Sequence, residues 1–446
     1  MSDNNEIDDI IKEIRNRNEG LDTEPEKAPE IEEALAETVK DPLSEEFTVS
    51  MDDYSPEYDE MEYKEHEKVG KNKKNIAIIA VAAVVVVAII VTAIVFAVKN
   101  KSKDEETTTQ KPSTTVSTTA APAVVTNPLT GEEGYNKSAV DVRPVACVVE
   151  NSYYARPQWG IDSKSNSPDI ILEGEVEGGE SRMLWFYADY TSLPDQIGPM
   201  RSARPPFIKF SEMFDAIFIH WGQSASKGNY VGAKTVFKQD NVDHINQMTT
   251  SGVSYLFGRD SSRNGYGVEH TGILHGDKVA QAIKDCGFRT KADNSAYTKF
   301  AFNDKEKAMS DTACNTLGLT FSSRTKTRDW TYNADDKMYH TGDFSNSNIG
   351  FSDVKRKNLL VLFDNTAYVV KDNYKNSGSS ETYCNYNLSG GKGKLASLGT
   401  VIDITWSVEN GKLSVKDSAG KEVKLNVGTT WIGWGSSNNS GSVTIG

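Results

Sequence analysis

The chain has few cysteines, and those it has show no recognisable spacing. Four occur in 446 residues: Cys147, Cys286, Cys314 and Cys384. No two of them share the Cys-x-x-Cys spacing of metal fingers and redox motifs. In an oxidising compartment they could form two disulfides, but spacing fixes neither the pairing nor its existence. The sequence therefore predicts no metal site and leaves the disulfide state open.

An excess of positive charge is also missing. Residues 1–75 contain 24 Asp and Glu against 10 Lys and Arg, which accounts for the whole net charge of −14. The other 371 residues contain 39 of each sign. A nucleic-acid partner is not expected, because binding a phosphate backbone needs a basic surface. The acidic segment 1–75 is expected to be a disordered tail.

Long apolar runs are rare, and one of them defines the layout. Ile76–Val98 contains no charged residue and spans about 30 Å as a helix, the thickness of a bilayer core. It begins too late and is too long for a cleavable signal peptide. We predict a single transmembrane helix at 76–98. Five lysines between 64 and 74 outnumber the three at 99–103, which favours a cytoplasmic N-terminus.

Two further segments flank this span. Residues 99–126 are rich in Ser and Thr and are expected to form an extended stalk. In the tail, Ile7, Ile10, Ile11 and Ile14 follow helical spacing. This Ile7–Ile14 stripe is either a docking motif for a cytoplasmic partner or a transient helix with no partner, since helices this short are marginal in water.

The rest of the chain predicts an α+β fold in two modules. Residues 127–290 interleave strand signals, at 143–150, 169–176, 182–190 and 216–222, with helix signals at 202–214 and 277–286, an α/β-like pattern. Residues 296–435 are mainly β: apolar side chains alternate over 402–408, and Asn410-Gly411 predicts a hairpin turn. Residues 436–446, rich in Gly, Ser and Asn, are expected to fray.

Polar groups concentrate in the first module, at strand ends and turns. Glu173, Glu175 and Glu177 lie on one face of a predicted strand, and Arg201 and Arg204 lie where a helix begins. The candidate binding residues are Glu173, Glu177, Arg182, Arg201, Ser202, Arg204, His220, Ser224, Arg259 and His270. We expect Glu173, Glu177, Arg201, Arg204, His220 and Ser224 to converge in one cleft.

Three interpretations of this group remain open. It is a structural ion network, a cleft for an anionic or sugar-like ligand, or a catalytic pair of carboxylates. A nucleophile–base pair of Ser224 and His220 lacks the surrounding G-x-S-x-G elbow. His270 and His275 do not have zinc spacing, and Gly390–Lys394 is no Walker loop, so no metal or cofactor is expected.

These stretches resemble a known family. The motifs are Asn127–Gly131, Ala155–Gln158 with Gly160, Glu173–Gly179, Gly198–Arg204, His220–Ser224 and Arg259-Asp260, followed by Gly391–Gly393, Gly411-Lys412 and Val423–Trp431. In this order they are similar to the YerB-like lipoproteins (domain of unknown function 3048). The resemblance implies an extracytoplasmic protein attached to a bacterial membrane, with an N-terminal and a C-terminal module and no established activity. This chain departs from the family in two ways. The predicted helix at 76–98 replaces a lipidated cysteine, and the segment Gly265–Glu269 precedes His270 in place of the short segment usual in the family.

The sequence as a whole predicts a single-pass bacterial plasma-membrane protein whose C-terminal domains are extracytoplasmic. The favoured function is non-catalytic binding of a cell-wall polymer or an envelope protein. One alternative is an enzyme acting on a wall or surface polymer, through Glu173 and Glu177 or through Ser224 and His220. A second alternative is a signalling link between the N-terminal tail and the outer domains.

Overall fold

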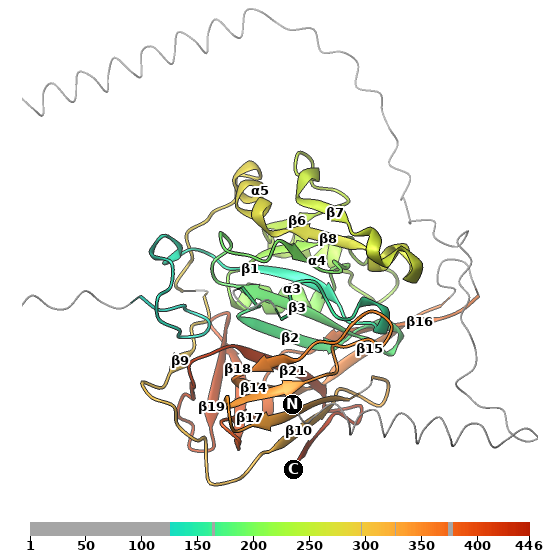
Figure 1. The fold of residues 1–446 in the computed structure, drawn as a ribbon. Helices are drawn as coiled ribbons and strands as arrows, with labels where there is room; N and C mark the ends of the chain where they lie inside the picture. Colours follow the sequence, from blue (N-terminus) through green and yellow to red (C-terminus); the bar gives the residue numbers. More distant parts are fainter. Residues whose placement is uncertain (1–124, 163–165, 296, 326, 373–377) are drawn as a thin grey trace, which may run out of the picture. The chain divides into compact units, whose positions relative to one another are not determined.

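A ten-stranded sheet runs through the folded part of the chain and contains strands from both halves (Figure 1). The computed structural model describes residues 125–162, 166–295, 297–325, 327–372 and 378–446. The strand order is β19 (Lys412–Asp417), β18 (Thr400–Glu409), β17 (Gly391–Ser397), β14 (Asn358–Asp364), β21 (Thr430–Ser436), β2 (Ile170–Glu175), β3 (Ser181–Tyr187), β1 (Val145–Glu150), β5 (Ile217–His220) and β6 (His244–Asn246).

The central strands are apolar because both of their faces are covered. Every residue of β1, β2, β3, β5 and β21 is buried. Strands covered on both faces have nearly continuous apolar sequences. In β18, by contrast, buried and more exposed residues alternate, because mainly one face of the strand is covered. Strands from both predicted modules are covered on both faces at the centre of the sheet, whereas β18 lies near its end.

The two predicted modules meet inside this sheet. Strand β2 pairs in parallel with β21, with Ile170 opposite Thr430 and Glu173 opposite Gly433. Strand β21 also pairs in parallel with β14. The sheet therefore continues from 127–290 into 296–435 without an edge between them.

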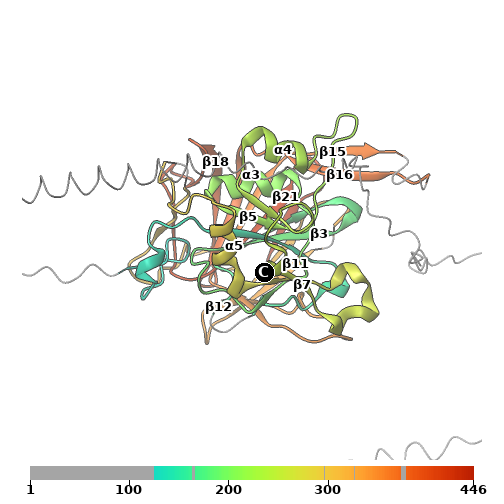
Figure 2. The same cartoon turned by 90° about the horizontal axis from the view of Figure 1, so that it is seen from above.

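One face of the sheet is covered by helices. Here α3 (Pro205–Met213), α4 (Ala233–Asp240) and the hairpin of β15 (Thr366–Lys371) and β16 (Glu381–Tyr386) pack on one apolar core. Figure 2 shows α3 and α4 together on this side of the sheet. We call it the helical face.

The opposite face carries smaller sheets and α5 (Val279–Asp285). One small sheet has the order β13 (Val354–Arg356), β12 (Met338–Thr341), β11 (Arg328–Asn333), β10 (Thr316–Thr320), β22 (Ser442–Ile445), and another has the order β4 (Gln196–Ile197), β8 (Gly272–His275), β7 (Phe257–Arg259). A short pair joins β20 (Lys424–Leu425) to β9 (Ala301–Phe302). The 3-10 helices are η2 (Lys137–Ala139), η3 (Tyr153–Ala155), η4 (Glu177–Gly179), η5 (Ser254–Leu256), η6 (Ser261–Tyr266), η7 (Val268–His270) and η8 (Gly276–Lys278).

The described residues form a mixed α and β fold made mostly of strands, as the α+β prediction requires. The predicted turn at Asn410-Gly411 joins β18 to β19, with φ values of 52° and 77°. The expectation that 436–446 frays is wrong, because β22 pairs with β10 and its Val443 and Ile445 pack against the core. The four cysteines are free thiols, and no disulfide joins them.

The membrane prediction falls on residues that the structure does not describe. Among the described residues, no helix has the length and apolarity needed to cross a bilayer. The segment Ile76–Val98, the tail 1–75 and nearly all of the stalk lie outside them. These assignments therefore stay predictions.

Candidate functional site

Several strands of the central sheet run in one direction and end at the same edge, which we call the carboxyl edge. They are β1, β2, β5, β6, β14 and β21, which end at Glu150, Glu175, His220, Asn246, Asp364 and Ser436. The antiparallel strand β3 begins here, so Arg182 lies opposite Glu150. Ligands of sheets with parallel strands commonly bind at this edge. Most of the sequence-predicted candidates lie on or beside it, and His270 reaches it through Glu150.

The segment Met200–Ala203 inserts where β1 and β5 separate. Arg201 donates its backbone N–H to Val148, and its carbonyl accepts from the N–H of Trp221. Ala203 donates to the carbonyl of Gly222 in the same way. The backbone is therefore fixed on both sides, while the side chains of Arg201 and Ser202 remain partly exposed.

Glu173 is fully buried and accepts five hydrogen bonds. Arg328 of β11 donates from Nε to Oε2 at 3.1 Å and from Nη2 to Oε1 at 2.9 Å. Trp431 donates to Oε2 at 3.1 Å, and Asn151 and Ser181 donate to Oε1 at 2.7 Å each. Burial alone would raise the pKa of Glu173, but Arg328 and the hydrogen bonds lower it below its usual value. No acceptor capacity is left for a ligand, so this carboxylate has a structural role.

Glu177 lies in η4, in a second and separate ion network. Arg204 closes on both of its oxygens, with Nε 2.8 Å from Oε2, and Arg182 reaches Oε1 at 3.4 Å. Burial opposes ionisation, yet these two guanidiniums hold the pKa of Glu177 well below its usual range. Arg182 and Arg204 also donate to the carbonyls of Ser202 and Ala203. This network ties η4 to the inserted segment.

A third group, which we call the Glu150 cluster, consists of Glu150, Arg201 and His270. Glu150 Oε1 lies 3.5 Å from Arg201 Nε, and its Oε2 lies 3.0 Å from His270 Nδ1. Burial raises the pKa of Glu150, but Arg201 and His270 together lower it below its usual value. The Arg201 side chain is 31% exposed and has no hydrogen-bond partner among the described residues. One side of this guanidinium is free for a ligand.

A partly buried aromatic ring, that of Trp221, continues the Glu150 cluster. Trp221 follows β5, and the guanidinium of Arg259 lies 4.7 Å from the centre of its ring. Arg259 donates to Val268 and to Thr271, beside His270. Trp221 and Arg259 therefore belong to the same surface as Arg201.

His220 and Ser224 do not form a catalytic pair. His220 lies 2.6 Å from the carbonyl of Gly222 through Nδ1 and 2.9 Å from His244 Nδ1 through Nε2. Burial, then the neighbouring His244, lowers the pKa of His220 to about 3, and burial lowers that of His244 to about 4. Ser224 Oγ instead accepts from the N–H of Ala233 and bonds to Tyr230. Ser224 thus supports the start of α4.

The predicted single cleft is therefore wrong, although most of the residues do gather at one edge. Glu173, Glu177, His220 and Ser224 each have their own partners, and the partners of Glu173 come partly from the second half of the chain. Sequence reasoning missed Glu150 and Asn151. Both end the apolar run of β1, so the strand-end rule applied to the other candidates could have found them.

No cofactor site emerges from the described part of the chain. Within it, no three His, Cys, Asp or Glu side chains lie close enough together to hold a metal ion. The donors at the carboxyl edge are arginines and carboxylates already paired with one another. Chemically, this arrangement can bind an anionic group through the guanidinium of Arg201 and its neighbours.

Known proteins share both the sequence pattern and the fold. Residues 129–289 match the family model described as "Protein of unknown function (DUF3048) N-terminal domain". Residues 317–432 match the corresponding "Protein of unknown function (DUF3048) C-terminal domain". The two matches cover the strands that form the central sheet from both sides.

One curated relative is "Putative lipoprotein YerB" of Bacillus subtilis (strain 168). It is 28% identical over 311 residues, which are 68% of this chain and 84% of the relative. A crystal structure of the YerB protein from the same species is 25% identical, with a TM-score of 0.56. That match covers 72% of this chain and 99% of the solved one.

Proposed function

The chain belongs to the DUF3048 family, and from this membership we propose that it is a membrane-attached envelope protein whose outer domains bind a cell-wall polymer. Binding takes place at the carboxyl edge, with Arg201 holding an acidic group of the polymer. The role is non-catalytic. The membrane anchor is the apolar segment 76–98, and the stalk 99–126 separates the folded domains from the bilayer.

The location rests on two independent observations. The curated relative carries the printed name of a lipoprotein, which is a protein attached to a membrane through a lipid. In this chain an uncharged run of bilayer length precedes a Ser- and Thr-rich segment and then the folded residues. Both arrangements support a location of the folded domains outside the cell and next to the wall.

One observation carries the binding proposal: Arg201 is incompletely paired beside arginines that are fully paired. Arg204 and Arg182 are nearly buried, and their hydrogen bonds go to Glu177 and to backbone carbonyls. Arg201 contacts Glu150 only at 3.5 Å and keeps part of its guanidinium in solvent. A guanidinium held at one end and open at the other suits phosphate or carboxylate recognition.

The same geometry favours binding over catalysis. Glu150, Glu173 and Glu177 all face arginines, which lower their pKa values, so none is a neutral acid ready to donate a proton. His220 and His244 are held neutral by burial and hydrogen-bonded to each other. Among the described residues, no hydroxyl or thiol is hydrogen-bonded to Nε2 of His270, whose neighbour there is Glu269 Oε1 at 3.9 Å. These groups at the carboxyl edge therefore do not form an assembled acid, base and nucleophile in the part of the chain that the structure describes.

Co-sedimentation with purified bacterial cell walls tests the proposal. The full-length protein in mild detergent should bind walls, and Arg201→Gln should weaken binding at least tenfold while the protein stays folded at the assay temperature. Lys238→Gln, which removes an exposed cation of α4, is the matched control and should bind as the wild type does. Unchanged binding by Arg201→Gln, or no binding by the wild type, would overturn the proposal.

The topology can be tested separately. Protease added to intact protoplasts should remove residues 127–446 and spare an epitope placed within 1–75. Protection of the folded domains would show that the proposed orientation is reversed.

A further inference from the structure

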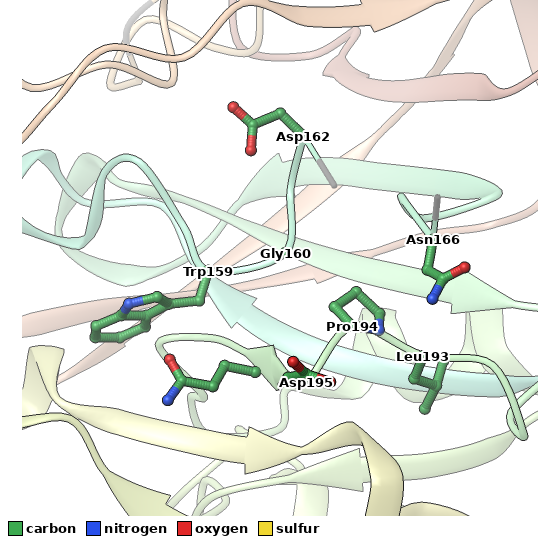
Figure 3. Close-up of a pocket in the computed structure, with 8 residues that line it drawn as sticks. Trp159, Gly160, Asp162, Asn166, Leu193, Pro194 and Asp195 are labelled. Carbon is green, nitrogen blue, oxygen red and sulfur yellow. The ribbon is translucent and has the colours of Figure 1, made fainter. Parts of the chain in front are cut away.

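A polar pocket of about 480 Å³ lies on the first half of the chain, apart from the Glu150 cluster. Its lining comes from two short segments, Trp159–Asp162 with Asn166 on one side and Leu193–Gln196 on the other. Figure 3 shows Asp162 and Asn166 on one side of this space, and Leu193, Pro194 and Asp195 on the other. The size falls in the range of small-ligand pockets.

The two lining segments are held close by glycine and by strand pairing. Gly160 has φ +87°, and a Cβ there would lie 2.9 Å from the carbonyl oxygen of Gln196. Trp159 exchanges backbone hydrogen bonds with Gly198, at 2.8 and 3.2 Å. Gln196 pairs with His275 as part of β4 and β8. The backbone of Trp159, Gly160 and Gln196 is therefore fixed on this side of the pocket.

The lining chemistry identifies the kind of ligand. Two carboxylates, Asp162 and Asp195, and two amides, Asn166 and Gln196, line an open depression together with Leu193, Pro194 and Trp159. None of the eight lining residues is Lys or Arg, and the guanidinium of Arg263, 4.0 Å from the centre of the Trp159 ring, donates to the carbonyls of Ala155 and Pro157, so the lining favours a neutral ligand over a phosphate or carboxylate. Carboxylates and amides accept and donate hydrogen bonds in the pattern that neighbouring hydroxyl groups require.

Exposed aromatic rings lie next to this pocket. Phe351 is 83% exposed, and its neighbours in the chain contact the pocket side: Ser352 donates to Asp162 at 2.9 Å, and a Cβ on Gly350 would lie 3.6 Å from Pro157. Tyr153, 43% exposed, bonds to Ser347 of the same loop. A fully exposed phenylalanine ring beside a polar pocket marks a contact surface, since apolar area of this kind is usually covered by a partner.

We propose that this pocket binds one sugar ring of a neutral, hydroxyl-rich saccharide, with Phe351 packing against the apolar face of an adjoining sugar. Asp195 and Gln196 hydrogen-bond the sugar hydroxyls, and Asp162 closes the other side. The inference rests on the proposed function, because it names the glycan part of the wall polymer as a second element recognised besides the acidic group at Arg201. The two sites have opposite charge requirements and can be tested independently.

A soluble oligomer of β-1,4-linked N-acetylglucosamine is the probe, titrated by calorimetry into the full-length protein in detergent. It should bind, and Asp195→Asn and Phe351→Ala should each weaken binding at least tenfold while the melting temperature stays unchanged. Asp335→Asn, in the exposed turn between β11 and β12, is the matched control and should bind as the wild type does. Arg201→Gln should also leave binding of this neutral probe unchanged.

The possible failures separate the two proposals. If walls are bound but the neutral oligomer is not, the saccharide inference is overturned and the proposed function stands. If the oligomer is bound but Arg201→Gln retains full wall binding, the Arg201 site fails and the saccharide inference stands. If only the deacetylated, positively charged oligomer binds, or if Asp195→Asn and Phe351→Ala bind normally, the pocket does not recognise a neutral sugar.

Discussion

Arg328 holds both carboxylate oxygens of Glu173, and the two residues come from opposite halves of the chain. Glu173 lies in β2, Arg328 begins β11, and both side chains are buried. Trp431 of β21 adds a hydrogen bond to the same carboxylate. The two family domains are thus joined in the interior by the pairing of β2 with β21 and by a buried ion pair beside it.

Removing the charge of Glu173 should destabilise the whole folded unit. Glu173→Gln leaves Arg328 buried with only the partly exposed Asp343 as a counter-ion, 3.2 Å from its Nη1, and breaking a buried pair typically costs about 3–5 kcal/mol of the free energy of unfolding. Urea unfolding followed by tryptophan fluorescence measures the change. The exposed Glu133→Gln is the control and should stay within about 0.5 kcal/mol of wild type. Equal stability of the two variants would show that the pair contributes little.

The two halves are expected not to fold separately. Cutting the chain near 291–295 would leave β2 and β21, both buried in the intact sheet, with open edges, and would separate Arg328 from Glu173. Residues 127–290 and 296–446, expressed alone, should aggregate, whereas 127–446 should unfold in one cooperative transition by calorimetry. A soluble fragment with its own sharp transition would show that the halves are independent.

Ser224 should affect stability but not binding. Its hydroxyl accepts from the N–H of Ala233 at the start of α4, so Ser224→Ala should cost about 1 kcal/mol, as loss of a helix-capping bond does. Wall binding should persist at temperatures well below the melting point. The exposed Ser251→Ala serves as control. Lost binding in a variant of unchanged stability would instead restore Ser224 as a functional group.

The His220–His244 pair should make the protein less stable as the pH falls below about 6.5. Burial lowers the folded-state pKa values to about 3 and about 4 from the usual 6.5, with Asp243 partly opposing the shift at His244. Between these values the unfolded chain binds more protons than the folded one, so the free energy of unfolding decreases with decreasing pH. Each imidazole contributes up to about 1.4 kcal/mol per pH unit.

His244→Gln isolates this effect. It removes one titrating group and keeps a donor for Nε2 of His220. Between pH 6.5 and 5, above the range where Glu173 and Glu177 become protonated in the unfolded chain, the variant should lose stability more slowly than wild type. Urea midpoints across this range measure the difference. Parallel pH profiles would contradict the proposed protonation of the pair.

Local features of the fold could be predicted from the sequence because their causes are local. The Asn410-Gly411 turn needs two residues that tolerate positive φ, and both adopt it. Gly287 follows α5 with φ +68°, as expected for a glycine that ends a helix. The apolar runs of β1 and β5 became buried strands because their composition alone demanded cover on both faces.

The site could not be predicted to the same degree, because partners lie far apart in the sequence. Glu173 and Arg328 are 155 positions apart, and Glu150 and His270 are 120 apart. Residue type and position at strand ends and turns singled out Arg201 and Glu177, which both lie beside the carboxyl edge of the sheet. Which carboxylate each arginine meets depends on the insertion of Met200–Ala203 between β1 and β5, and no local pattern encodes that insertion.

The place of β21 between β14 and β2 also sets the timing of maturation. A ribosome makes β2 more than 250 residues before β21, which at roughly 5–20 residues per second is a delay of about 10–50 s. Throughout this interval the apolar strand β2, paired with β3 on one side, has an open edge on the other, and for the first 155 residues of it the carboxylate of Glu173 also lacks Arg328. This half of the nascent chain therefore needs chaperones that shield exposed strand edges more than the other half does. A chain truncated just before β21 would keep the open edge of β2 and would continue to need them.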